Sequence, residues 1–75
     1  MIKEHNRVVL TASLPAHGLV AGDVGTVVHV YEDGKAYEVE FFTLDGNTAD
    51  VVTVEGHQVR GVTGREINHS RPLAA

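Results

Sequence analysis

The chain has 75 residues, of which 43% are hydrophobic and 21% charged, and its formal net charge at pH 7 is −4. This length allows one small domain, and the composition is that of a globular protein and excludes a disordered one. The acidic balance argues against binding to a nucleic-acid backbone, and the absence of cysteine excludes disulfides and thiol catalysis.

The first predicted elements are a short strand at residues 8–10 and a long irregular loop at residues 11–23. Loops of this length in compact domains are usually functional or are held together by their own side chains. We expect Leu14 and Leu19 to hold this one. A second strand, rich in β-branched residues, is predicted at residues 25–31.

The clearest strand signal is the alternating sequence Ala-Tyr-Glu-Val-Glu-Phe-Phe at residues 36–42. One side of this strand carries Tyr37, Val39 and Phe41, and the other carries Glu38, Glu40 and Phe42. We expect the first side to be buried, because an extended chain places alternate residues on one face. Phe42 is then the large apolar residue that we expect to be exposed or covered by the C-terminal tail.

A tight hairpin is predicted between these two strands, because Asp33-Gly34 between apolar runs is typical of such a turn. A second turn is centred on Gly46. Two more strands are predicted at residues 50–54 and 59–62, with a single turn at residues 55–58 between them.

Five short strands with one long first loop are typical of a small SH3-like barrel. We therefore expect one all-β domain over residues 1–75, with its strands within residues 7–62. The tail, residues 63–75, could form a helical turn, a sixth strand, or an extended arm that packs through Ile67 and Leu73. No apolar run could cross a membrane and no signal peptide is recognisable, so we expect a cytoplasmic protein.

Five glycines are predicted to serve structural turns: Gly18, Gly22, Gly25, Gly34 and Gly46. Glycine adopts positive φ without steric cost, which allows the first loop to reverse into the following strand. A phosphate-binding loop is the alternative for the first three, but it needs a helix N-terminus or a lysine, and neither is predicted there.

Negative charge is concentrated in the middle of the chain. We define the acidic ridge as Asp23, Glu32, Asp33, Glu38, Glu40, Asp45, Asp50 and Glu55, which Lys35 alone opposes within residues 23–55. The ridge could dock a basic partner, with charge setting the encounter rate and specificity. The alternative, which is the more common role of an exposed acidic sheet face, is a solvated surface whose charges prevent aggregation through sheet edges.

Neither a metal site nor a catalytic site is predicted. The five histidines do not have the spacing of metal ligands on a strand or helix, and no cysteine completes a site. His29 is predicted to share a strand face with Val27 and Tyr31, which we expect at the surface. Ser13 and Ser70 lack the glycine pattern of a nucleophile elbow. We therefore expect no metal ion, no cofactor and no enzymatic activity.

A combination of stretches spans most of the chain: Val8-Val9-Leu10, Leu14-Pro15-Ala16-His17-Gly18-Leu19, Gly22-Asp23-Val24-Gly25-Thr26-Val27-Val28, Val30-Tyr31-Glu32-Asp33-Gly34, Ala36-Tyr37-Glu38-Val39-Glu40-Phe41, Gln58-Val59-Arg60 and Glu66-Ile67-Asn68-His69-Ser70-Arg71. In this combination the chain resembles a family of small bacterial proteins called domain of unknown function 4926. The resemblance implies an SH3-like domain without established enzymatic activity. It also implies an antitoxin or immunity-like role, because members often lie beside genes for small toxins.

Three functional hypotheses follow. The first is a non-enzymatic protein-binding module with candidate contact residues Glu38, Glu40, Phe42, Tyr31, Arg60 and Arg71, its partner being a toxin encoded nearby. The second is a nucleic-acid-associated module, since residues 22–27 are similar to a glycine-rich pattern of KOW-type ribosomal and transcription barrels, although the acidic charge opposes it. The third is a homo-oligomer, such as a dimer joined through the exposed edge of residues 8–10 or through the tail.

Overall fold

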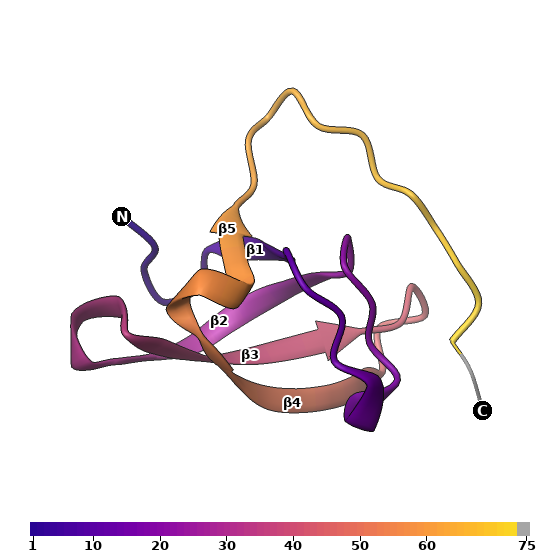
Figure 1. Ribbon diagram of the computed structural model, residues 1–75. Helices are drawn as coiled ribbons and strands as arrows, with labels where there is room; N and C mark the ends of the chain where they lie inside the picture. The colour runs from indigo at the N-terminus through magenta and orange to yellow at the C-terminus, as the bar shows by residue number, and fades with distance from the viewer. Residues whose placement is uncertain (74–75) are drawn as a thin grey trace.

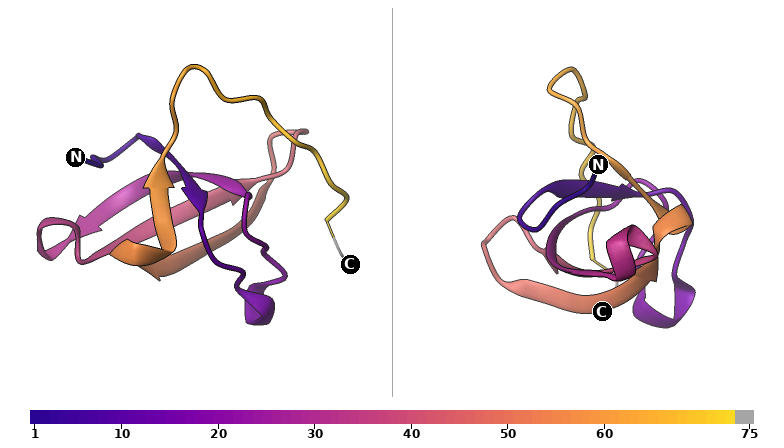
Figure 2. Two further views of the ribbon diagram at one scale, coloured as in Figure 1. Left: turned by 45° about the horizontal axis from the view of Figure 1, so that its top comes forward. Right: turned by 90° about the vertical axis from the view of Figure 1, so that its left-hand side faces the viewer.

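Five β-strands form a single antiparallel sheet in the order β4-β3-β2-β1-β5, in a computed structural model that describes residues 1–73 (Figure 1). The elements in chain order are β1 (Arg7–Leu10), η1 (Pro15–His17), β2 (Val24–Tyr31), η2 (Glu32–Gly34), β3 (Ala36–Phe42), β4 (Thr48–Glu55), η3 (Gly56–Gln58) and β5 (Val59–Gly61), where η marks a short 3₁₀ turn. The all-β prediction is therefore confirmed, and each predicted strand is present. The sheet curls around its inner face (Figure 2), but within residues 1–73 no pairing joins β4 to β5, so the sheet is open.

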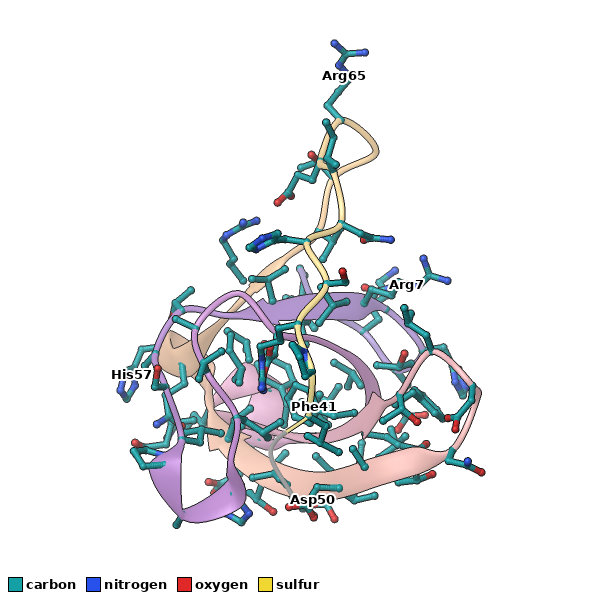
Figure 3. All side chains as sticks on the ribbon, turned by 90° about the vertical axis from the view of Figure 1, so that its right-hand side faces the viewer. Arg7, Phe41, Asp50, His57 and Arg65 are labelled. Carbon is teal, nitrogen blue, oxygen red and sulfur yellow. The ribbon has the colours of Figure 1, made fainter. Side chains whose placement is uncertain are left out.

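The core fills the inner face of this curled sheet. Its buried members are Val8, Leu10, Leu19, Val27, Tyr37, Val39, Phe41, Val52, Val54 and Val59. At its centre, Val39 of β3 lies in register between Val27 of β2 and Val52 of β4. Val27 and Val39 are both fully buried, as expected for β-branched side chains on the covered face of a central strand. Figure 3 shows Phe41 within the curl of the sheet.

Strand β1 does not offer the exposed edge that the dimer hypothesis requires, so that expectation is wrong. It lies inside the sheet, paired with β2 on one side and with β5 on the other. All of its apolar residues are buried. The free edges of the described sheet are β4 and β5, because the short β5 pairs with the second edge of β1.

A β-bulge in β2 changes which residues share a face. Val27 pairs with Val39, and the next aligned pair is His29 with Glu38, so Val28 is an extra residue. The prediction that His29 lies at the surface is confirmed, but its grouping with Val27 is wrong, because Val27 is fully buried. The bulge reverses the alternation after Val27, which strict period-two reasoning does not anticipate.

Gly25 does not lie in a turn with positive φ, contrary to expectation. It is a buried residue of β2, and a Cβ placed on it would lie 2.5 Å from Val39 Cγ1 and 2.9 Å from the Glu40 carbonyl oxygen. Close approach of β3, and not a special backbone conformation, therefore requires glycine here. The other four glycines predicted in turns are Gly18, Gly22, Gly34 and Gly46, and each has positive φ.

The first loop is held as predicted. The Leu14 N–H donates to the Leu19 carbonyl at 2.8 Å, and the Leu19 N–H donates back to Leu14 at 3.3 Å. Leu19 is buried in the core, and Leu14 packs against it. The loop is thus a small folded unit attached to the sheet.

The tail has neither a helix nor a strand between residues 62 and 73. It leaves β5, arches away from the sheet and turns back (Figure 1). Packing through Ile67 is wrong, because this side chain is 95% exposed, and Leu73 is also exposed. The last two residues of the predicted tail lie outside the described residues. Within residues 1–73, no helix has the length and hydropathy of a membrane span.

Candidate functional site: the outer face of β2, β3 and β4

We call the surface of β2, β3 and β4 opposite the core the outer face. Strand pairing aligns its side chains in two cross-strand rows, Thr26–Glu40–Val51 and His29–Glu38–Thr53. Alternation in β3 carries Glu38, Glu40 and Phe42 outward while the residues between them are buried. The register therefore places two carboxylates side by side in the middle of the outer face.

Hydroxyl groups hold both carboxylates. Glu38 Oε1 accepts hydrogen bonds from Tyr31 Oη at 3.1 Å and from Thr53 Oγ1 at 2.7 Å. Glu40 Oε2 accepts one from Thr48 Oγ1 at 2.5 Å. The bond to Glu38 raises the pKa of Tyr31, because the phenol donates only while it is protonated. One oxygen of each carboxylate therefore has a hydroxyl partner, and within residues 1–73 the other oxygen accepts no hydrogen bond.

No cation of the described chain neutralises these two carboxylates. The ion pairs among residues 1–73 join His17 to Asp50, His29 to Glu4, His57 to Glu55, Arg60 to Glu66 and Arg71 to Asp23. Arg7 lies in the same row as Glu40, but Thr26 stands between them. Within the described residues, Glu38 and Glu40 thus form no ion pair.

Exposed apolar side chains border the carboxylates. Phe42 is 48% exposed on β3, Val51 is 45% exposed on β4, and Val24 is 40% exposed on β2. The expectation of an exposed Phe42 is confirmed. Tyr31, which packs edge-on against the His29 ring with centroids 4.4 Å apart, lies toward the other end of the face. The outer face thus combines charge with apolar area, as protein contact surfaces do.

Arg60 and Arg71 lie elsewhere and hold the tail. Arg60 donates to both oxygens of Glu66, at 3.0 and 2.8 Å. Arg71 donates to both oxygens of Asp23, at 2.9 and 2.5 Å, and to the Gly18 carbonyl at 3.1 Å. The bond from Arg71 holds the pKa of Asp23 below its ordinary value. Four of the six candidate contact residues therefore gather on the outer face, whereas the two arginines are engaged within the chain.

The Arg60–Glu66 contact makes a prediction about pH. The hydrogen bond from Arg60 lowers the pKa of Glu66 from 4.5 to about 2. Because the folded-state pKa is depressed, the stabilisation from this pair is complete above pH 4.5 and is lost as the pH falls through about 2. In Arg60→Gln, the pKa of the Glu66 carboxyl should rise above its wild-type value, although the remaining hydrogen bond from the Thr63 N–H still lowers it; NMR of the side-chain carboxyl carbon measures the change. Arg65→Gln is the matched control, because Arg65 points away from the sheet at the top of the arch that the tail forms (Figure 3). Equal titration in both variants would contradict the pairing.

The acidic ridge is divided among several environments. Asp23 binds the tail, and Asp50 contacts His17 of the first loop at 3.1 Å. Asp45 accepts hydrogen bonds from Thr43 and Asn47 within the β3–β4 turn, and the bond from Thr43 lowers its pKa. Of the ridge, Glu38 and Glu40 are the members that β3 places together at the centre of the outer face.

Neither the surface hollows nor the arrangement of possible metal ligands in residues 1–73 identifies a second candidate site. One surface hollow of about 570 Å³ is lined by the N-terminal segment, by Arg7 of β1 and by the chain at and after the end of β5. Another of about 290 Å³ lies between the first loop and Arg71. Glu38 and Glu40 line neither. Within the described residues, no group of three or more histidine, aspartate or glutamate side chains could hold a metal ion.

Sequence reasoning missed part of the outer face. The two threonines that bond the carboxylates come from β4, and their positions follow only from the β3–β4 register. The exposure of Val24 and Val51 was also not predicted, because each belongs to a valine-rich stretch of the kind that is usually buried. The strand alternation of Val51 with the buried Val52 was the signal that could have identified it.

Comparison with known proteins identifies the family of the chain. The model of the family described as "Domain of unknown function (DUF4926)" matches residues 4–61, which include all five strands and the whole outer face. No curated protein and no solved structure shows a significant match. The matched region covers more than three quarters of the 75 residues, so the chain belongs to the DUF4926 family.

Proposed function

We propose that this domain is a non-enzymatic module that binds a basic surface of another protein through its outer face. The observation that carries the proposal is the pair Glu38 and Glu40, whose carboxylates are bonded by hydroxyl groups and form no ion pair within residues 1–73. A carboxylate already held in place loses less conformational entropy on binding than a free one. The neighbouring apolar side chains supply area that a partner can cover.

A surface designed only for solubility would not need this arrangement. Exposed acidic side chains keep a protein soluble in any rotamer, so hydroxyl donors on two neighbouring strands add nothing to that role. Exposed Phe42 and Val51 would also work against solubility. Both features favour a binding surface.

We further propose that the fold is related to SH3-like barrels, with the gap between β4 and β5 left unpaired. Three features support this: the strand order with β5 beside β1, the long folded loop between β1 and β2, and the 3₁₀ turn η3 that interrupts the chain between β4 and β5.

The partner class that we propose is a small basic toxin encoded near the protein in a bacterial cytoplasm. The experiment is capture of the tagged protein from its own source, in parallel with Glu38→Lys/Glu40→Lys. We expect one basic protein in near-equal amount with the wild type and its loss with the double variant, because the two cations would repel it. A partner retained by the double variant would contradict binding through the outer face.

A further inference from the structure

We propose that the end of the tail, residues 67–73, is a strap that closes over the first loop, with Arg71 as its clasp. The strap opens as a unit while the sheet and the first loop stay folded. In the closed form it covers the carboxylate of Asp23 and the hollow beside it, and in the open form both are accessible. The ion pairs of the tail involve neither Glu38 nor Glu40, so the strap does not depend on the proposed function.

The tail leaves the domain at β5 and returns to it at the first loop. It arches away from the sheet (Figure 1), and Figure 3 shows it passing in front of the curled sheet on its way back. Residues 62–73 are all exposed, Ile67 to 95%, and none of them belongs to the core. A segment without buried apolar contacts can open locally at a much lower free energy than the sheet unfolds.

A turn at the root of the tail fixes the place where the strap begins. Arg60 donates to both carboxylate oxygens of Glu66, and the Thr63 N–H donates to Glu66 Oε2 at 2.9 Å. The two charged partners are six residues apart in sequence, so this turn does not need the rest of the tail. The root therefore stays on β5 when the strap opens.

Arg71 is the point at which the strap is fastened. Its guanidinium donates to both oxygens of Asp23 and to the Gly18 carbonyl. The Arg71 side chain is 30% exposed and that of Asp23 is 17% exposed, in contrast to the residues that precede Arg71 in the strap. A single ion pair of this kind is opposed by the conformational entropy of ordering the strap, so the closed and open forms are close in free energy.

The first loop keeps its shape without the strap. Asp23 Oδ2 also accepts a hydrogen bond from the Val20 N–H at 2.9 Å, which holds the carboxylate within the loop. The hollow of about 290 Å³ has one wall from residues 20–23 and the other from His69 and Arg71. Opening therefore removes one wall of the hollow and leaves the other in place.

The test is a spin-label measurement on the full chain. Because the chain has no cysteine, Asn68→Cys gives a single site for a nitroxide label within the strap. NMR then measures how strongly the label broadens the amide signals of the first loop. Three labelled forms are compared: the otherwise wild-type chain, Arg71→Gln, and Arg65→Gln. The last is the matched control, because it removes a cation from the top of the arch.

We expect broadening of the Gly18 and Val20 amide signals in the otherwise wild-type chain and in Arg65→Gln. In Arg71→Gln the ratio of the closed to the open form should fall about fivefold or more, because the charge-assisted hydrogen bonds of the clasp are lost. The broadening should fall with it. The midpoint temperature of thermal unfolding of unlabelled Arg71→Gln should stay close to that of the wild type, because the sheet does not need the strap.

Broadening that is absent from the otherwise wild-type chain would overturn the closed strap, and broadening that persists unchanged in Arg71→Gln would overturn the clasp. An equal loss in Arg65→Gln would mean that net charge alone holds the strap, which contradicts the role of Arg71. A clearly lower unfolding midpoint for Arg71→Gln would show that the tail unfolds together with the sheet, and it would overturn the separate opening of the strap.

Discussion

Phe41→Ala is expected to destabilise the domain by about 3–5 kcal/mol, because it empties the space of a buried aromatic ring in the core. A 75-residue domain has a total stability of about 4–11 kcal/mol. The variant should therefore lose a large share of the stability of the domain, and it unfolds at room temperature if the wild type lies at the low end of this range. Urea unfolding followed by circular dichroism measures the change.

The neighbouring Phe42→Ala is the matched control, since it removes the same ring from the exposed outer face. It should cost about 1 kcal/mol or less. According to the proposed function it should nevertheless weaken partner binding. Similar losses of stability in the two variants would show that β3 is not oriented as described.

Gly25→Ala should destabilise the domain by about 1–3 kcal/mol or more, because the new Cβ would overlap the β3 backbone and the Val39 side chain. The contact at 2.9 Å involves the Glu40 carbonyl oxygen, which cannot move without disturbing the pairing of β2 with β3. Thermal unfolding should show a clearly lower midpoint temperature.

Gly61→Ala provides the comparison for this prediction. Gly61 also lies in a strand, but a Cβ on it would meet no atom within 4 Å. This variant should lie within about 1 kcal/mol of the wild type, on the stabilising side, since alanine restricts the unfolded chain. Equal destabilisation by the two alanines would argue against close approach as the reason for Gly25.

Much of the fold could be predicted because its signals are local. The alternation at residues 36–42 and the Asp33-Gly34 turn define β3 and its hairpin within about ten residues. The position of β1 could not be predicted, because β5 covers its second edge and the two strands are some fifty residues apart. The bulge at Val28 could not be predicted either, because Val27 and Val28 are identical residues and the sequence does not show which of them is unpaired.

The candidate site divides in the same way. Glu38, Glu40 and Phe42 follow from the alternation of a single strand. The partner of Arg71 could not be inferred, because Asp23 lies 48 residues away in sequence and meets it only through the return of the tail. The sequence suggested that Arg71 could bind a partner, but its side chain is engaged with Asp23 of the same chain.

The measurement that tests the central claim most directly is the affinity of the captured partner for three forms of the protein. These are the wild type, Glu38→Gln/Glu40→Gln, and Glu32→Gln/Asp33→Asn, compared by titration calorimetry at fixed salt. Binding through the outer face predicts an affinity about tenfold or more weaker for the first variant and unchanged for the second. An equal effect of both variants would mean that net charge alone attracts the partner, and it would contradict a binding site at Glu38 and Glu40.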